Sequence, residues 1–291
     1  MRYAPIPGVA FVHIPKNAGQ SVRNALRAVT PLSYAPLATD LGVTEAEAED
    51  AVERGFPHET LGEIHPAHLT LHLLSGHFPA SWAALTTAHS FAMTRAPRAR
   101  FVSALMQRMK EFGKAGDLRA DDPALRSEAA QVCDWLAGRD HFSDLPYIHF
   151  TRQTAFTDLN GSRIVSAVFP VDRMDALSHW LTATAGLTIE VTHDHARRQP
   201  KPMARLLTPV VRLASRTLLP RPVRRVLHPL WTGSRLFDTA AKGYAKLDFG
   251  PEVETFITQY YAADTALHDE AMTAAKIWGQ TAPASMGDKS P

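Results

Sequence analysis

The alternation of apolar and polar residues in the first part of the chain predicts short strands followed by amphipathic helices. Residues 8–14 form a β-prone run, the loop PKNAGQ follows, and SVRNALRAV has the spacing of a helix that begins near Gln20 or Ser21. Residues 90–95 predict another strand, and after it Phe101, Leu105 and Met109 recur at every fourth position, as on one helix face. The strand-loop-helix pattern therefore occurs twice before residue 112.

Further segments continue this scheme. Residues 69–78, with the sequence LTLHLLSGHF, predict a buried strand that runs into a Gly-His turn. Thr44 and Glu47 have the spacing of a capping box and predict a helix over 44–55, and helices are also expected over 123–136 and 252–272. Residues 163–186 predict a strand followed by a helix. Strands that alternate with helices indicate an α/β fold with a parallel sheet of about four or five strands, covered by helices on both faces.

In such sheets, ligands bind outside the carboxyl ends of the strands. Lys16, His77 and Arg95 each come at the end of a predicted strand. We therefore expect these three side chains to meet at one edge of the sheet.

Composition and charge limit the class of protein. The chain has 291 residues, of which 45% are hydrophobic and 21% charged, as is typical of a globular protein with a substantial core. With a net charge of only +2, the chain is not a polycation, so we expect no nucleic-acid partner. Cys133 is the single cysteine, which fits a reducing compartment, and no apolar run approaches the length of about 20 residues that spans a bilayer. We expect a mature, cytoplasmic bacterial protein.

The expected organisation is one domain over 1–275 and a flexible C-terminal tail over 276–291. Within the domain, residues 197–235 are rich in arginine and proline and contain no acidic residue, which suggests a basic helical insertion. Three interpretations of this insertion stay open: it holds an acidic glycan, it contacts the surface of the inner membrane, or it is an ordinary solvent-exposed face.

The loop after the first predicted strand has the chemistry of an anion site. The N-terminus of a helix offers unpaired amides and the positive end of its dipole, and Lys16 adds a charge beside them. In the ATP-binding P-loop the lysine follows the second glycine, whereas here Lys16 precedes Gly19. The strand at 90–95 ends in Arg95, where nucleotide hydrolases usually place an aspartate for Mg²⁺. Both features favour an anion site without a metal.

These segments resemble the sulfotransferases that use 3′-phosphoadenosine 5′-phosphosulfate (PAPS), in particular the group with the carbohydrate, heparan-type O-sulfotransferases and many bacterial relatives. FVHIPKNAGQS is similar to the 5′-phosphosulfate loop of that family, and TRAPRARFVSAL is similar to its 3′-phosphate element. SGHF resembles the segment that holds the general base in the carbohydrate enzymes. Weaker similarity is found at Gln153, in VFPVDRMDAL and in YYAADTALHDEA.

The resemblance implies a P-loop NTPase-like fold and the transfer of a sulfuryl group from PAPS to a hydroxyl group, on a carbohydrate or a glycolipid, without a metal. Lys16 would neutralise charge on the leaving phosphate, and His77 would accept the proton of the acceptor. Arg95 and Ser103 would hold the 3′-phosphate. The 5′-phosphosulfate would lie against the loop and the helix start, formed by Pro15, Lys16, Asn17, Ala18, Gly19, Gln20 and Ser21.

Several alternatives stay open. Arg100 is either a second phosphate contact or part of the outward helix face, and His13 is interpreted as a core histidine. The spacing of His65, His68, His72 and His77 would suit a metal cluster on a helix, whereas a strand would spread these side chains apart. The rival functions are a P-loop nucleotide kinase or other phosphotransferase, and a non-catalytic anion-binding or membrane-binding protein on the same fold.

Overall fold

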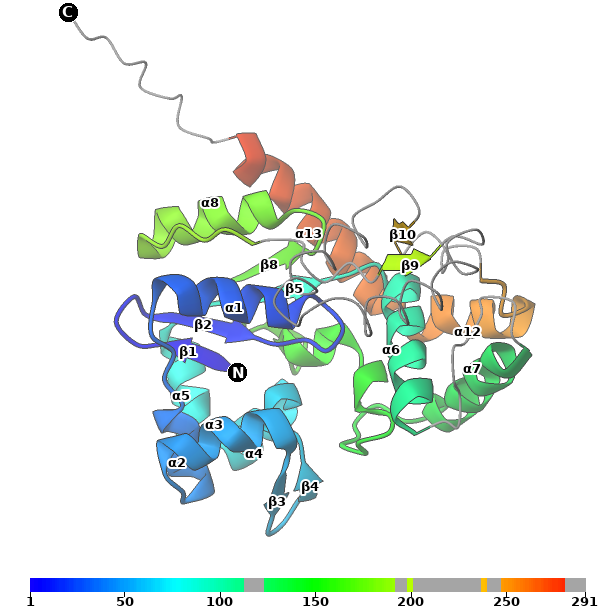
Figure 1. The fold of residues 1–291 in the computed structure, drawn as a ribbon, viewed down its shortest axis with the longest axis horizontal. Coiled ribbons are helices and arrows are strands. Elements are labelled where there is room, and N and C mark those ends of the chain that lie inside the picture. Colours follow the sequence, from blue (N-terminus) through cyan, green and yellow to red (C-terminus); the bar gives the residue numbers. More distant parts are fainter. Residues whose placement is uncertain (113–122, 192–197, 201–236, 240–246, 281–291) are drawn as a thin grey trace, which may run out of the picture.

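The computed structural model describes residues 1–112, 123–191, 198–200, 237–239 and 247–280 (Figure 1). A sheet in the order β1-β2-β5-β8 lies at its centre. The sheet is built from β1 (Arg2–Ala4), β2 (Val9–Val12), β5 (His89–Thr94) and β8 (Ala167–Pro170). β2, β5 and β8 are parallel, and β1 pairs antiparallel with β2 at the edge. The α/β class is confirmed, although the sheet is mixed rather than wholly parallel.

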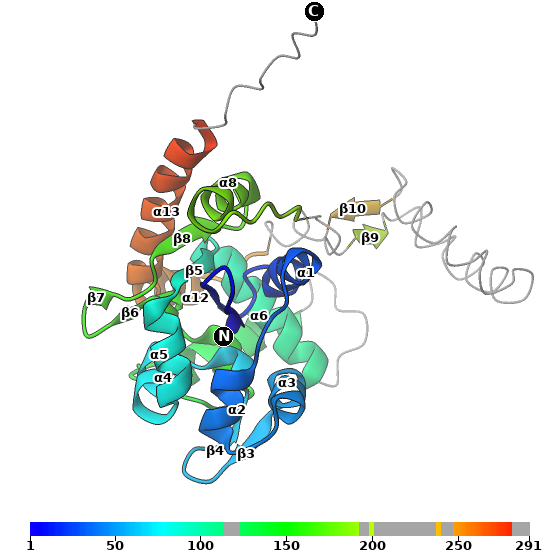
Figure 2. The same cartoon turned by 90° about the vertical axis from the view of Figure 1, so that its left-hand side faces the viewer.

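Helices cover both faces of the sheet (Figures 1 and 2). On one face, Phe11 and Phe91 pack with α1 (Gly19–Val29) and α8 (Met174–Ala185). On the other face, Ala10 and Ala92 pack with α2 (Ala35–Leu41), α3 (Glu45–Arg54), α4 (Leu71–His77) and α5 (Pro79–Thr87). Because both faces are covered, β5 is buried along all but its first residue, and its centre is the apolar run Phe91–Met93.

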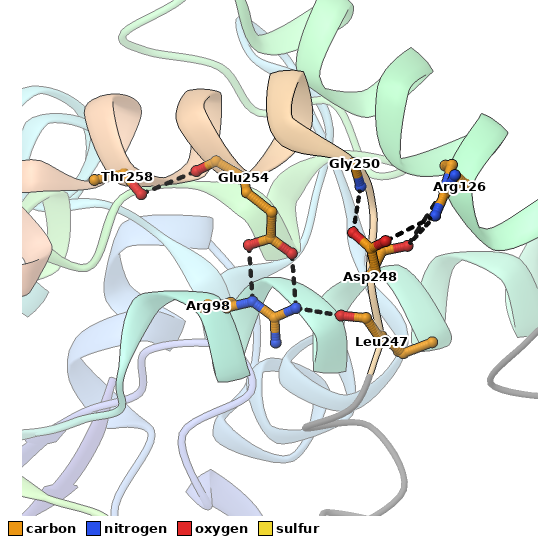
Figure 3. Close-up of polar contacts among 7 residues, drawn as sticks. All are labelled: Arg98, Arg126, Leu247, Asp248, Gly250, Glu254 and Thr258. Atoms are coloured by element: carbon orange, nitrogen blue, oxygen red, sulfur yellow. Dashed lines mark hydrogen bonds and ion pairs between the residues drawn. The ribbon is translucent and has the colours of Figure 1, made fainter.

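A third core lies beside the sheet. It is formed by α6 (Pro97–Glu111), α7 (Pro123–Leu136) and α12 (Pro251–Tyr260), and α13 (Ala262–Gln280) follows α12. Figure 3 shows how the start of α12 is held. Arg98 donates from Nε and Nη2 to the carboxylate of Glu254, at 2.8 and 2.7 Å, and also to the carbonyl of Leu247. Arg126 binds Asp248, so α6 and α7 both anchor this segment.

Short elements complete the described fold. They are the hairpins β3 (Phe56–His58) with β4 (Gly62–Ile64) and β6 (Asp158–Leu159) with β7 (Ser162–Arg163), the 3₁₀ turns η1 (Pro66–His68), η2 (Ile148–Phe150) and η3 (Gln153–Phe156), and the pair β9 (Arg198–Pro200) with β10 (Phe237–Thr239). In the part of the chain described here, no helix combines the length and apolar character that a membrane crossing requires.

The capping box at the start of α3 is confirmed. The Glu47 amide donates to Thr44 Oγ1 (3.3 Å), and the Thr44 amide donates to Glu47 Oε2 (2.8 Å). The helices expected near residue 20, around Phe101, Leu105 and Met109, and over 123–136 also form, as α1, α6 and α7. These elements share strong local signals, either a cap or a long amphipathic period.

The prediction of a strand over 69–78 is wrong, because residues 71–77 form α4. Thr70 caps this helix by accepting a hydrogen bond from the Leu73 amide (3.4 Å). Leu71, Leu74 and Phe78 are buried, a spacing of three and four residues that suits a helix. A short apolar run is compatible with either structure, and here the cap and the packing against α5 favour the helix.

Three further boundaries differ from expectation. The closing helix predicted over 252–272 is two helices, α12 and α13, which meet at the buried Tyr261. α13 continues to Gln280, so the expected tail over 276–291 begins with helix, and 281–291 lie outside the described residues. Of the insertion expected over 197–235, residues 198–200 form β9, and 201–236 lie outside the described residues.

Candidate functional site

A cavity of about 860 Å³ lies at the carboxyl ends of the parallel strands. Its lining includes residues that follow each of these strands: Lys16 after β2, Arg95 after β5 and Asp172 after β8. Of the residues expected to hold the donor, it is lined by Lys16, Ala18, Gly19, Gln20, Ser21, Arg95 and Ser103. The size lies within the range of about 300–1,000 Å³ typical of small-molecule sites.

The loop before α1 has an unusual backbone. Lys16 has φ 69° and Ala18 has φ 58°, so both lie in the left-handed region although neither is glycine. This conformation costs a non-glycine residue about 1–2 kcal/mol, and such strain concentrates at functional sites. Ala18 precedes α1, and no side chain caps the helix there. The first amides of α1 therefore suit a bound anion.

Gly19 is required by the position of His13. A Cβ atom at residue 19 would lie 1.8 Å from His13 Nε2 and 2.0 Å from His13 Cδ2, far inside contact distance. The imidazole of His13 lies against the backbone at the start of α1 and lines the cavity. The lone glycine of the loop thus allows the first helical turn and a histidine ring to lie in direct contact.

Gln153 connects the loop to the end of β5. The buried Asn17 donates from Nδ2 to the carbonyl of Met93 and to Gln153 Oε1, both at 2.7 Å. Gln153 Oε1 also accepts from the Arg95 amide (2.9 Å), and Gln153 Nε2 donates to the Arg95 carbonyl (2.9 Å). Asn17 therefore lies beneath the site as an anchor, and Asn17 and Pro15 are absent from the cavity lining.

Arg100 is neither a phosphate contact nor part of the outward helix face, so both interpretations are wrong. Its side chain is buried, with 1% of the residue exposed. Nε donates to the carbonyl of Pro15 (3.1 Å), and Nη2 donates to those of His149 (3.1 Å) and Thr151 (2.7 Å). The buried guanidinium thus ties the loop to the segment around η2.

Asp264 on α13 supports the same region. Its buried carboxylate accepts hydrogen bonds from the amides of Gln153 (2.8 Å) and Thr154 (3.0 Å). Burial raises the pKa of Asp264, which the charge of Arg100 and these hydrogen bonds counteract. α13 thereby positions Gln153, although it lies more than a hundred residues further along the chain.

The two cations of the cavity lie close together. Arg95 Nη1 donates to the carbonyl of Lys16 (3.4 Å), and Lys16 Nζ donates to Gln107 Oε1 on α6 (3.5 Å). Arg95 is partly buried, and burial lowers the pKa of its guanidinium while Asp172 opposes this effect. Ser103 lies on α6 one turn before Gln107. Lys16 therefore lies between Arg95 and the side chains that continue along α6.

Of the described residues, four histidines line the cavity, namely His13, His65, His68 and His149, and the last of these lies near Lys16. We call this group the histidine wall. The ring of His68 lies at its centre, with centroid distances of 4.9 Å to His13, 4.6 Å to His65 and 5.4 Å to His149. Within the described structure, Nδ1 of His65 and of His68 is buried without a hydrogen-bond partner.

The histidine wall is uncharged at neutral pH. Burial lowers the pKa of His13, His65 and His68. Burial, followed by the charges of Lys16 and Arg100, lowers the pKa of His149 to about 3. From the sequence, only His65 and His68 of these residues were candidates for a function, as metal ligands. His65 and His68 share one segment, but His13 and His149 come from two others, so no motif spacing marks the four as a group.

His77 does not lie with Lys16 and Arg95. It is exposed at the end of α4, is not part of the cavity lining, and its ring lies 6.3 Å from that of His58 in β3. The reason is that 71–77 form a helix instead of a strand that ends at the site. His72, which the spacing in the sequence grouped with His77, stacks on His141, with ring centroids 5.0 Å apart. Within the described ranges, no group of three or more His, Cys, Asp or Glu residues is placed to hold a metal ion.

Comparisons of the chain with protein-family models, with curated proteins and with solved structures gave no match.

Proposed function

We propose that this chain is a sulfotransferase, which moves a sulfuryl group from PAPS to a hydroxyl group on a carbohydrate or a glycolipid. The observation that carries the proposal is that the helix N-terminus with Lys16 shares one cavity with Arg95 and Ser103. A nucleotide with phosphates at both its 5′ and 3′ positions needs two anion sites at one surface. The resemblance of the two segments to sulfotransferase motifs agrees with this geometry.

In this proposal, the 5′-phosphosulfate lies at the amides of Gly19, Gln20 and Ser21, where the dipole of α1 and its unpaired donors favour negative charge. Arg95 and Ser103 bind the 3′-phosphate, because a guanidinium can contact phosphate with two parallel hydrogen bonds. Asn17 and Gln153 fix the loop of Lys16 and the end of β5 relative to each other through the hydrogen bonds described above.

The acceptor hydroxyl attacks sulfur, so that an oxygen-sulfur bond forms while the bond between sulfur and the bridging oxygen breaks. The electron pair of that bond remains on the 5′-phosphate. The ammonium group of Lys16 neutralises this growing charge, which stabilises the transition state more than the ground state.

The proton of the acceptor hydroxyl goes to His149 rather than to His77. His149 lines the cavity beside Lys16, and its imidazole is neutral and can accept a proton. Burial is the main cause of the low pKa of His149, and the charge of Lys16 contributes to it. An anionic donor beside Lys16 offsets that contribution, so His149 becomes a stronger base when the donor is in place.

Nucleotide binding tests the proposal. We expect adenosine 3′,5′-bisphosphate to raise the Tm of the full chain in the absence of Mg²⁺, and to do so more than 5′-AMP. Arg95→Ala should remove the difference between the two nucleotides, because it removes a ligand of the 3′-phosphate. If ATP stabilises the protein better, and only with Mg²⁺, the chain is a P-loop phosphotransferase instead. Binding of polyanions or liposomes that survives Lys16→Ala, without nucleotide binding, indicates the non-catalytic alternative.

A further inference from the structure

The histidine wall leaves nitrogen atoms open to a ligand. His68 is 8% exposed and lines the cavity, and its Nδ1 is buried without a partner among the described residues. Nε2 is therefore the nitrogen through which this ring can reach a ligand. Because nothing bonded to Nδ1 selects the tautomer, Nε2 of His68 can either donate or accept a hydrogen bond. The same argument applies to His65.

A hydroxyl group matches this kind of surface. It carries one donor and two acceptor lone pairs, so it satisfies an imidazole nitrogen in either tautomer. Several neighbouring rings, with centroids 4.6–5.4 Å apart, can bind adjacent hydroxyl groups of one molecule. The neighbouring Leu145 and Ile148 offer apolar surface to the C–H faces of a ring.

With the anionic donor in place, the remaining charges on this side of the cavity disfavour a second anion. The histidines are neutral because burial lowers their pKa. Glu111, which lines the cavity and accepts a hydrogen bond from Gln107, places a carboxylate next to the wall. Burial and then the charge of Arg2 lower the pKa of His65, and the carboxylates of Glu53 and Glu111 oppose this effect. Lys16 would attract an acidic group on the side of His149, but in the proposed complex the anionic donor takes up that charge. An acidic group bound to the wall with the donor in place would be repelled by Glu111 and would gain no attraction from the imidazoles.

We infer that the histidine wall is the acceptor site, and that it binds an uncharged, hydroxyl-rich molecule of the neutral-sugar type. That the bound molecule is the acceptor rests on the proposed function, in which the sulfuryl group is transferred at Lys16, next to the wall. Binding of a neutral sugar to the wall is a separate property that can be measured without any nucleotide.

The experiment compares two sugars that differ only at C6: methyl β-D-glucoside, which has a hydroxymethyl group there, and methyl β-D-glucuronide, which has a carboxylate. Binding to the full chain is measured by NMR, with and without saturating adenosine 3′,5′-bisphosphate. His68→Phe keeps an aromatic ring and removes both nitrogens. His77→Phe is the matched control, since His77 is exposed and outside the cavity lining.

With saturating bisphosphate, we expect the glucoside to bind the wild type at least about tenfold more tightly than the glucuronide. His68→Phe should weaken glucoside binding about fivefold to tenfold, as expected for one lost hydrogen bond, and should change the Kd of the bisphosphate less than about twofold. His77→Phe should change neither. In the wild type, an imidazole C–H signal of the wall should shift on addition of the glucoside, which tests the inference even if His68→Phe does not fold.

Each contrary result has a clear meaning. Tighter binding of the glucuronide with saturating bisphosphate, or glucoside binding that neither depends on His68 nor shifts a wall signal, overturns the inference. If the bisphosphate binds while the glucoside fails in this way, the sulfotransferase proposal stands and only its acceptor is wrong. If the glucoside binds through His68 but the bisphosphate does not bind, the sulfotransferase proposal fails and the sugar site stands.

Discussion

Arg100 is the residue whose replacement tests the architecture of the site most directly. Three backbone carbonyls, those of Pro15, His149 and Thr151, accept hydrogen bonds from its buried guanidinium. Arg100→Met keeps much of the side-chain volume and removes all of these donors. Because one of the carbonyls belongs to the loop before α1, the same change should also loosen the proposed donor site.

The magnitude follows from these contacts. A hydrogen bond from a charged donor contributes about 1.5–3 kcal/mol, and a buried carbonyl left without a donor costs about 1–3 kcal/mol. Part of this loss is recovered, because a buried guanidinium no longer has to be desolvated. We expect Arg100→Met to lower the free energy of unfolding by about 3–5 kcal/mol and the Tm by about 10 °C.

Arg98 provides a matched control two positions earlier in the same helix. Its side chain is 36% exposed, and it pairs with Glu254, which is 32% exposed (Figure 3). Such a partly exposed pair contributes about 1 kcal/mol or less, so Arg98→Met should be mild. Urea unfolding followed by circular dichroism measures both variants. If Arg100→Met is no more destabilising than Arg98→Met, the assignment of Arg100 as the buried anchor of the loop is wrong.

Three further predictions concern the loop and the histidine wall. Gly19→Ala should lower the free energy of unfolding by about 1–3 kcal/mol, because the new Cβ would overlap His13. The control Gly76→Ala, whose Cβ meets open space in α4, should be neutral or stabilising. Equal effects of the two changes in thermal unfolding would contradict the contact between Gly19 and His13. Gln153→Leu should weaken binding of adenosine 3′,5′-bisphosphate by about tenfold or more in calorimetry, since it separates Asn17 from Arg95, and an unchanged Kd would refute the positioning role. The pKa of His149 is about 3 in the folded state and near 6.5 in the unfolded chain. The stability of the fold that depends on a neutral His149 is therefore fully present above about pH 6.5 and is lost as the pH falls towards about 3. We expect a loss of about 1–2 kcal/mol at pH 5 from this partly exposed ring, and urea unfolding at pH 7 and 5 should show a smaller difference in His149→Phe than in the wild type.

Local signals in the sequence were sufficient for much of the scaffold. The capping box of Thr44 and Glu47 determines where α3 begins, because both groups lie within one helical turn. The apolar run of β5 and the amphipathic period of α6 likewise depend on neighbours in the chain. Lys16 and Arg95 were placed at one edge of the sheet because consecutive parallel strands must end there.

The residues that sequence analysis missed or misplaced depend on packing. For 69–78, the apolar pattern was compatible with both strand and helix, and the cap at Thr70 with burial of Leu71 and Leu74 decided for the helix. That choice moved His77 away from the cavity. Arg100 appeared as one more arginine of a basic motif, and only the folded chain shows that it is buried among carbonyls.

The strand-loop-helix units around Lys16 and Arg95 and the cap of α3 were determined by the sequence itself, because periodicity, caps and the direction of parallel strands act over short distances along the chain. The histidine wall, the role of Gln153 between Asn17 and Arg95, and the buried position of Arg100 were decided only by the tertiary structure. Each of these joins segments far apart in the sequence, and a side chain's charge and hydrogen-bond partners depend on which distant segments bury it.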